Sequence, residues 1–385
     1  MSKDKKRLVP VRRFKEFENA PAWEQRKLGE VVEITMGQSP SSKNYTENPN
    51  DHILVQGNAD MKNGHVVPRV WTTQITKQAE KGDLILSVRA PVGDIGKTDY
   101  DVVLGRGVAA IKGNSFIFQL LTKMKINGYW TRFSTGSTFE SINSDNIKNA
   151  QISIPSLREQ EKIGGLFNEF DSLIALHQRK LDKLKRVKSA YLTEMFPAEG
   201  EREPKRRFPG FTVAWEQRKL GDVVNRFDNL RIPVTASKRI HGEFPYYGAN
   251  GIQDYVDGYT HNGEYILVAE DGASNVYDYP VNYVKGKVWV NNHAHVIQGK
   301  TNIADNLFLL NAIKSINIAS FLVGGSRAKL NAEIMMELPI KIPSYNEQKK
   351  IGKYFANIDS LITLHQRKLD KLKKMKAAYL EEMFV

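Results

Sequence analysis

The chain contains no cysteine and no long apolar run among its 385 residues. The absence of cysteine excludes disulfides, thiol nucleophiles and cysteine-ligated zinc. No apolar run approaches the ~18 residues needed to span a membrane. The basic N-terminus also lacks the apolar core that signal peptides carry. We therefore expect a cytoplasmic protein that does not enter a membrane.

Nucleotide-binding motifs are present only as near misses. The segment GDIGKT at 93–98 ends as a phosphate-binding loop does, but Pro91 stands where GxxxxGK[ST] requires its first glycine. Gly299-Lys-Thr has Ala294 in the same place. Both segments are therefore interpreted as turns rather than as phosphate sites.

Signatures of catalysis are also missing. Asp278-Tyr-Pro lacks the second proline of the paired-proline motif of amino-methyltransferases. The sequence has no glycine-rich methionine-cofactor loop and no nuclease cluster of carboxylates and lysine. His293 and His295 stand two residues apart, but no third metal ligand can be identified. We expect a non-catalytic chain that binds no metal and no cofactor of its own.

The charge balance is strongly basic, with a formal net charge of +13. An excess of this size favours a polyanionic partner, most often a nucleic acid. The same charge also occurs in proteins that bind no nucleic acid, so it supports such a function without establishing it.

A long repeat dominates what the sequence does contain. Phe170 to Phe196 reads FDSLIALHQRKLDKLKRVKSAYLTEMF, and Ile358 to Phe384 reads IDSLITLHQRKLDKLKKMKAAYLEEMF, 188 positions later. The heptad spacing of apolar residues predicts two long helices that pack as an antiparallel coiled coil. The residues expected to pack in this spacer are Phe170, Ile174, His177, Leu181, Leu184, Tyr191, Ile358, Ile362, His365, Leu369, Leu372 and Tyr379. The two histidines are interpreted as packed or interhelically hydrogen-bonded side chains.

Shorter repeats mark where each half begins and ends. AWEQRKLGEVV at 22–32 recurs as AWEQRKLGDVV at 214–224, and IPSLREQEKIG at 154–164 recurs as IPSYNEQKKIG at 342–352. These segments predict a leader (1–22), a first domain (23–155), a first spacer helix (156–196), a linker (197–214), a second domain (215–343) and a second spacer helix (344–385).

Between these boundaries the two halves share only a faint skeleton. Gly82-Asp-Leu-Ile-Leu is paired with Gly263-Glu-Tyr-Ile-Leu, and Val108-Ala-Ala-Ile with Ala294-His-Val-Ile. Strands are predicted at 52–56, 83–88, 102–104, 265–269 and 287–290, and helices at 116–127 and 313–323. Each domain is therefore expected to be mixed α/β (α+β), within an internal pseudo-twofold repeat.

Capping-box spacing predicts the start of each spacer helix. Ser156 and Ser344 each stand three residues before a glutamate and directly after a proline.

Polar side chains that suit base edges and phosphates gather near glycines inside both variable regions. Arginine suits guanine and asparagine suits adenine in the major groove, while lysine and hydroxyl groups suit phosphates or bases. The candidates for DNA contact are Arg89, Arg106, Ser134, Thr135, Ser137 and Thr138 in the first half, and Asn291, Asn292, His293, Ser326, Arg327 and Lys329 in the second.

The paired AWEQRKLG segments, the IPSxxEQ segments and the DSLIxLHQRKLDKLK helices resemble the specificity subunit of type I restriction-modification systems. The resemblance covers essentially the whole chain and implies two target-recognition domains that read an asymmetric bipartite site on double-stranded DNA. It implies docking of two modification subunits, which would bind S-adenosylmethionine and methylate adenine N6. Restriction subunits that use ATP and Mg would join through them.

Two other functions stay open on the residues alone. The first is a stand-alone DNA-binding regulator with two reading domains and no methyltransferase partner. The second is a catalytic nuclease or methyltransferase, although the motifs for that chemistry are missing. Copurification of partner subunits distinguishes the first from the specificity subunit, and activity of the isolated chain would indicate the second.

Overall fold

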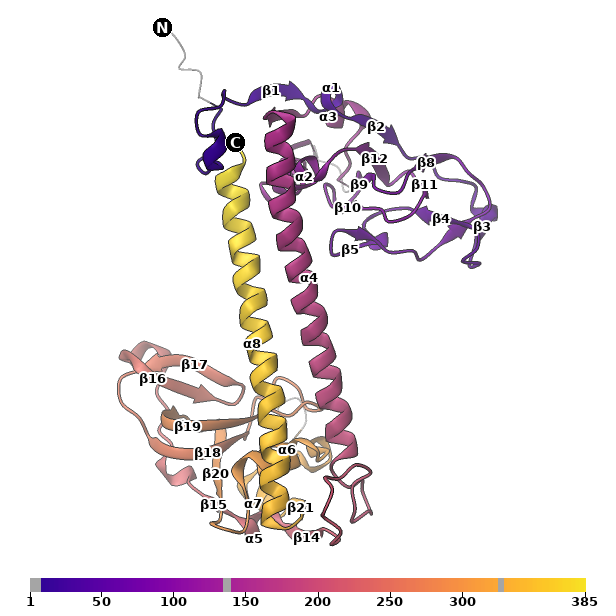
Figure 1. Cartoon of the computed structure of the whole chain (residues 1–385). Coiled ribbons are helices and arrows are strands. Elements are labelled where there is room, and N and C mark those ends of the chain that lie inside the picture. The colour runs from indigo at the N-terminus through magenta and orange to yellow at the C-terminus, as the bar shows by residue number, and fades with distance from the viewer. Residues whose placement is uncertain (1–7, 134–139, 325–328) are drawn as a thin grey trace. The chain divides into compact units, whose positions relative to one another are not determined.

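The computed structural model describes residues 8–133, 140–324 and 329–385 (Figure 1). Its internal contacts divide the chain into two compact units. Unit 1 comprises residues 1–177 and 368–385, and unit 2 comprises residues 178–367. Among the described residues, every helix is too short or too polar to cross a membrane.

Unit 1 is built mainly on β-strands. These are β1 (Glu24–Lys27), β2 (Glu33–Met36), β3 (Tyr45–Thr46), β4 (His52–Val55), β5 (Met61–Lys62), β6 (His65–Val66), β7 (Trp71–Thr72), β8 (Lys77–Ala79), β9 (Leu84–Ser87), β10 (Ile95–Lys97), β11 (Val102–Leu104), β12 (Val108–Lys112) and β13 (Gln151–Ile154). One sheet has the order β2-β12-β9-β10-β6-β5, a second has β3-β7-β4-β11-β8, and β1 pairs with β13. The strands predicted in this half are confirmed.

Unit 2 has one large sheet and a small ribbon. Its strands are β14 (Glu216–Lys219), β15 (Val224–Arg226), β16 (His241–Gly248), β17 (Gly251–Val256), β18 (His261–Ala269), β19 (Val281–Val290), β20 (Ala294–Gly299) and β21 (Pro339–Ile342). The sheet order is β15-β20-β18-β19-β16-β17, and β14 pairs with β21. The expected mixed α/β class and the internal repeat are confirmed.

The helices pack against these sheets and link them. They are α1 (Leu28–Val31), α2 (Ser115–Ile126), α3 (Ser144–Lys148), α4 (Leu157–Glu194), α5 (Leu220–Val223), α6 (Asn306–Lys314), α7 (Ala332–Met336) and α8 (Tyr345–Met383). The prediction of a helix at 116–127 is confirmed by α2.

The prediction of a helix at 313–323 is wrong. The helix of this region, α6, starts after Asp305, whose carboxylate accepts a hydrogen bond from the Phe308 amide at 2.9 Å. It ends at Lys314, and the chain then forms only a short 3-10 turn at Ile318–Phe321. The N-cap at Asp305 fixes the start of the helix. After Lys314, the Ser315 hydroxyl donates to the Ala312 carbonyl at 2.7 Å, and serine and asparagine at 315 and 317 compete with the helical backbone for hydrogen bonds.

The sequence aligned β9 of unit 1 with β18 of unit 2, and the structure shifts this alignment by one residue. Ile111 pairs with Leu84 in unit 1, and its counterpart Ile297 pairs with Ile266 in unit 2. Leu84 therefore corresponds to Ile266 and not to Tyr265. Side chains alternate between faces along a strand, so a shift of one residue would exchange the two cores. Leu84 packs in the Trp23 cluster and Ile266 in the equivalent Trp215 cluster.

In each unit, a segment of α4 runs antiparallel to a segment of α8. In unit 1, Phe167 contacts Phe384 and Phe170 contacts Tyr379. The residue number of the partner falls as the residue number on α4 increases, which is the pattern of antiparallel helices. The Lys376 ammonium lies 2.6 Å from the Asp171 carboxylate. Unit 2 repeats this ion pair between Lys188 and Asp359, also at 2.6 Å.

The expected spacer positions lie on the less exposed face of each helix. Four of these residues are buried, namely Phe170, Leu181, Ile358 and Leu369. The other eight are half-buried, namely Ile174, His177, Leu184, Tyr191, Ile362, His365, Leu372 and Tyr379.

Three aromatic rings pack together in the core of each unit with similar geometry. In unit 1, Trp23 meets Phe116 at 5.5 Å and Phe384 at 6.2 Å between ring centroids. In unit 2, Trp215 meets Phe308 at 5.7 Å and Phe196 at 5.9 Å. Such pairs contribute ~0.5–1.5 kcal/mol each beyond their buried area.

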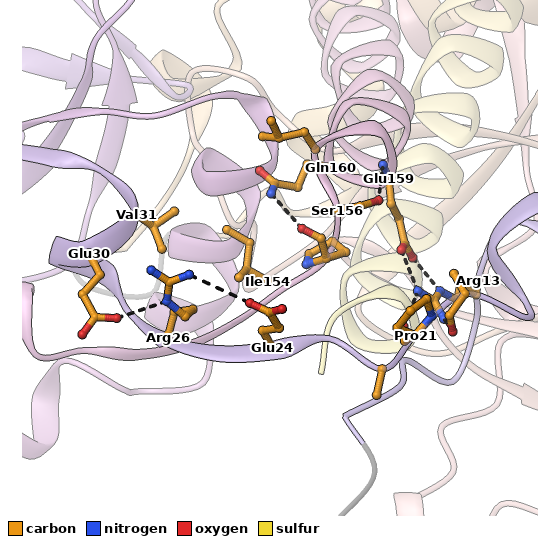
Figure 2. A pocket seen from close by; sticks show the side chains of 14 residues that line it. Arg13, Pro21, Glu24, Arg26, Glu30, Val31, Ile154, Ser156, Glu159 and Gln160 are labelled. Atoms are coloured by element: carbon orange, nitrogen blue, oxygen red, sulfur yellow. Dashed lines mark hydrogen bonds and ion pairs between the residues drawn. The ribbon is translucent and has the colours of Figure 1, made fainter.

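A buried ion pair anchors the N-terminal end of each long helix. In unit 1, the Arg13 guanidinium donates to both oxygens of Glu159 at 2.7 Å, as Figure 2 shows. Arg207 and Glu347 repeat this arrangement in unit 2, at 2.7 and 2.8 Å. The predicted capping box is thus only half formed. The Ser156 hydroxyl accepts from the Glu159 amide at 3.4 Å, but the glutamate side chain is bound by arginine.

Gly164 in α4 lies against the first turn of α2. A Cβ at this position would approach Ser115 Cβ to 2.9 Å and the Phe116 backbone nitrogen to 3.0 Å. We expect Gly164→Ala to lower the free energy of unfolding by ~1–3 kcal/mol, because backbone or helix packing must shift to admit the methyl group. Chemical denaturation of the full chain measures this change.

The adjacent Gly165 provides a matched control, because it is in the same helix and a Cβ there would meet nothing within 4 Å. Gly165→Ala should leave stability unchanged or raise it by ~0.5–1 kcal/mol through helix propensity. Equal effects of the two substitutions would contradict the close approach at Gly164.

Candidate nucleic-acid interface

Three chain segments that are distant in sequence meet at one end of the sheet in unit 1. The amide of Val88, just after β9, donates to the Gly107 carbonyl in the turn before β12, at 2.9 Å. The Ile142 amide donates to the Val88 carbonyl at 3.0 Å. An isolated β-bridge joins Arg89 to Ser141. These contacts bring together the end of β9, the turn 105–107 and the segment 140–142.

Two of the predicted reading residues lie in this arrangement. Arg89 follows β9 directly, Arg106 lies in the turn before β12, and both side chains are exposed. The Arg106 amide donates to the Ser39 hydroxyl at 3.1 Å, which ties the turn to the chain after β2. The other four candidates of this half, Ser134, Thr135, Ser137 and Thr138, lie outside the described residues.

Unit 2 brings together the three equivalent segments. The Glu270 amide, after β18, donates to the His293 carbonyl at 2.9 Å, and the Leu330 amide donates to the Glu270 carbonyl at 2.8 Å. An isolated bridge joins Asp271 to Lys329. The end of β18, the turn 291–293 and the segment 329–330 therefore form a second candidate interface with the backbone pattern of the first.

Equivalent positions of the two interfaces carry unlike side chains. Matching hydrogen bonds align Arg89 with Asp271, Arg106 with Asn292, and Ser141 with Lys329. An arginine, a carboxylate and an amide present different donors and acceptors to a base edge. The same scaffold thus offers two different chemical surfaces.

The predicted readers of unit 2 divide by their exposure. Asn292 and His293 are exposed, and the imidazole of His293 lies 2.5 Å from the Asp271 carboxylate. Lys329 is half-buried, and its ammonium lies 2.8 Å from the Glu270 carboxylate. Ser326 and Arg327 lie outside the described residues.

Asn291 differs from the other readers because only 3% of it is exposed. Its side-chain oxygen accepts from the His293 amide at 2.8 Å. Its backbone amide donates to the Tyr247 carbonyl at 3.1 Å. Asn291 is thus buried beneath the turn, and its side chain holds the turn together.

A charged network beneath the second interface was not predicted. Arg231 donates to Glu270 at 2.7 Å and to the Ala294 carbonyl at 3.0 Å, and also approaches the Asn292 carbonyl. His295 lies between Asp228 and the Leu330 carbonyl. The sequence signal for this network is a histidine within an otherwise apolar buried strand, β20, whose polar side chain needs hydrogen-bond partners. Sequence reasoning missed this signal.

The network holds its carboxylates in the charged form. Burial alone would raise the pKa of Asp228, but hydrogen bonds from His295 and the Val296 amide outweigh it and lower that pKa below its usual range. Burial likewise opposes ionisation of Glu270, whose pKa is nevertheless lowered by Lys329 and Arg231. Both carboxylates are thus available as acceptors at neutral pH.

A separate pocket in unit 1 is lined by the repeated boundary segments rather than by predicted readers. Figure 2 shows Glu24, Arg26 and Glu30 on one side of it, with Ser156 and Gln160 at the start of α4. Arg26 pairs with Glu30 at 3.2 Å. Within the described ranges, no group of three His, Asp or Glu side chains is arranged to hold a metal ion.

The long helices also leave four leucines exposed at equivalent places in the two copies. Leu173 and Leu176 lie on α4, and Leu361 and Leu364 lie on α8. Exposed apolar side chains that recur on each copy of a repeat are typical of contact with another protein. They lie in different units, at 37–45% exposure each.

A family model matches the chain in two segments, and a solved structure resembles its fold. The family model described as type I restriction modification DNA specificity domain matches residues 21–186 and 212–374. A crystal structure of a type I restriction-modification system S subunit from M. genitalium has a TM-score of 0.76 over 98% of this chain and 99% of that chain. Its sequence identity is 15%, so this likeness supports the fold alone.

Curated relatives share parts of the sequence. A putative type I restriction enzyme specificity subunit of Haemophilus influenzae is 43% identical over 152 residues, which cover 40% of this chain and 39% of the relative. A putative specificity subunit of Methanocaldococcus jannaschii is 30% identical over 174 residues, which cover 43% and 40%. The chain thus matches about two fifths of the length of either relative.

The depressed pKa of Asp228 generates a prediction for stability against pH. A carboxyl whose pKa is lowered by folding stabilises the native state above its unfolded pKa, and this contribution is lost as pH falls through the folded pKa. We expect Asp228→Asn to be less stable than the parent at pH 7 by ~1–3 kcal/mol. The difference should shrink below about pH 4.

Urea unfolding of both proteins across this pH range measures the effect. Asp257→Asn, at an exposed carboxylate of the same unit, is the control and should follow the parent. A difference between Asp228→Asn and the parent that stays constant down to about pH 2 would contradict ionisation of Asp228 as its origin.

Proposed function

Because the chain belongs to the family of type I restriction modification DNA specificity domains, matched twice along its length, we propose that it reads an asymmetric bipartite site on double-stranded DNA. Each unit carries one target-recognition domain and contacts one half of the site. The chain itself performs no chemistry on DNA. Its role is to decide which sequence its partner subunits act on.

The observation that carries this proposal is the pair of equivalent interfaces with unlike side chains. Arg89 and Arg106 present cationic forks, which suit guanine or phosphate. Asp271 and Asn292 occupy the same two positions in unit 2. A carboxylate accepts from the amino group of cytosine, and an amide suits adenine. Two identical surfaces would favour a repeated half-site, whereas these favour two different ones.

The partners in this proposal are two modification subunits and, through them, restriction subunits. The modification subunits would bind S-adenosylmethionine and methylate adenine N6, and the restriction subunits would use ATP and Mg. The repeated segments support docking of two copies of one partner, because a repeated sequence offers the same contact twice. The exposed leucine pairs on α4 and α8 are the apolar part of that contact.

Arginine 89 provides a test of base reading. We expect Arg89→Ala to weaken binding to DNA that carries the preferred half-site of unit 1 by ~1–3 kcal/mol, because a bidentate contact to guanine is lost. Binding to duplexes altered only in that half-site should change little. Fluorescence anisotropy at fixed salt with both duplexes measures the difference.

Arg218→Ala is the control for charge, since it removes an exposed arginine from β14 of the other unit. It should reduce binding to all duplexes equally and slightly. If Arg89→Ala also weakens every duplex to the same extent, Arg89 contacts phosphate instead of a base.

Stoichiometry tests the proposed assembly. Coexpression with the modification subunit should give a complex with two modification subunits per chain. We expect Leu173→Asp with Leu176→Asp to leave one, because a buried carboxylate would disrupt only one docking surface. Leu361→Asp with Leu364→Asp should have the same effect, and all four changes should abolish docking. Native mass spectrometry counts the subunits.

Ile126→Asp is the control for an exposed apolar residue outside the long helices, and it should keep two partners. A parent chain that binds DNA but never retains a modification subunit would be a stand-alone DNA-binding regulator. A chain that binds neither would refute the proposal.

A further inference from the structure

His295 connects the core of unit 2 to its candidate interface. It lies in β20 and is 1% exposed. Its Nε2 is 2.8 Å from the Leu330 carbonyl oxygen, and its Nδ1 is 2.7 Å from Asp228 Oδ2. Leu330 directly follows Lys329, which bridges to Asp271. The imidazole therefore holds one of the three segments that form the interface.

Both partners of the ring are hydrogen-bond acceptors. A carbonyl oxygen cannot donate, and neither can an ionised carboxylate. Each ring nitrogen must carry a proton for both contacts to be hydrogen bonds, so the geometry fits the imidazolium form. A neutral ring would satisfy only one of the two acceptors and leave the other without that donor.

The other two segments are tied to the same network. Arg231 reaches Glu270 at the end of β18 and the carbonyls of Asn292 and Ala294 around the turn before β20. Arg231 also lies 3.6 Å from Asp228. Asp228 and Arg231 thus link His295 to the other two segments. Arg231 donates to the Asp228 backbone carbonyl at 3.1 Å, and its bonds to Glu270 and to the two carbonyls of the turn are charge-assisted.

Among the described residues of unit 1, an alanine stands at the place equivalent to His295. The pairing of β12 with β9 matches that of β20 with β18 and places Ala109 where unit 2 has His295. A methyl group cannot hold the Ile142 carbonyl, which is the counterpart of the Leu330 carbonyl. The two interfaces therefore share a backbone pattern and differ in how that pattern is held.

We propose that His295 is a positioning residue for base recognition by unit 2. Its ring fixes the Leu330 carbonyl, and with it the segment that carries Lys329, against Asp271 and the turn of Asn292. This inference rests on the proposed function. Loss of the ring loosens base choice in the half-site read by unit 2 and leaves the other half-site unaffected.

Charged groups surround the ring of His295. Asp228 contacts the ring, and Glu270 Oε2 lies 3.7 Å from Nδ1. Arg231 and Lys329 pair with Glu270. The two carboxylates therefore adjoin the ring directly, and the two cations pair with a carboxylate rather than with the ring.

The experiment uses the full chain in complex with its modification subunits and a pool of duplex DNA with randomised bases. Sequencing of the bound fraction gives the base preferences of each half-site. Arg89→Ala identifies the half-site read by unit 1. The parent is then compared with His295→Leu, which removes both hydrogen bonds, and with His295→Gln, which can still donate to the Leu330 carbonyl.

We expect His295→Leu to reduce base preference in the second half-site by ~10-fold or more, with the first half-site unchanged. His295→Gln should restore part of that preference.

The outcomes separate this inference from the proposed function. If the parent complex selects no sequence, the proposed function fails. If the parent selects two half-sites and both variants keep the same preferences, the positioning role is refuted. Should His295→Leu fail to fold, the glutamine variant decides, because it loses the contact with Asp228. A folded His295→Gln with full preference in the second half-site overturns the proposal.

Discussion

The closure of each aromatic core by the distant end of a long helix is the constraint on which the remaining structure depends. Phe384, at the end of α8, packs against Trp23 and Phe116 near the start of the chain. Phe196, at the end of α4, packs in the same way against Trp215 and Phe308. Each core contains a phenylalanine from the other half of the sequence. Both halves must therefore form the same tryptophan and phenylalanine site in which that ring packs.

This requirement explains why the repeat is strict where it is structural. The Arg13–Glu159 pair and its copy Arg207–Glu347 bind the leader and the linker to the first turn of each long helix. Breaking a buried pair of this kind costs ~3–5 kcal/mol, because an uncompensated charge remains. The residues at the ends of the strands between these ion pairs take no part in this packing. Arg89 can therefore be exchanged for an aspartate at the equivalent position without disturbing the shared packing.

The long helices and the boundaries of the two halves could be predicted from the sequence, because their patterns are local and occur twice. Heptad spacing, the capping serines and segments repeated at a constant offset each identify an element without knowledge of the fold. The interfaces could be predicted only as lists of polar residues, because their assembly depends on pairing between segments far apart, such as Val88 with Gly107. The one-residue shift at Tyr265 and the misplaced helix after Lys314 arose where the pattern was short and unrepeated.

The buried charges of unit 2 need a reason beyond stability. Transferring Asp228, Glu270, Arg231 and His295 away from water costs free energy that their mutual attraction only roughly offsets. An apolar core of the same volume, such as Ala109 and its neighbours provide in unit 1, would be at least as stable. An apolar core provides no directional contacts, since dispersion forces do not fix the orientation of a carbonyl or a turn as hydrogen bonds do. In the complex with DNA that we propose, the carboxylate of Asp271 faces a polyanion and needs that fixed orientation. Phosphates would repel Asp271 unless it meets a donor on a base, so a small error in its placement would weaken binding more than it would for an arginine. The network in unit 2 therefore lies beneath the interface that tolerates misplacement least.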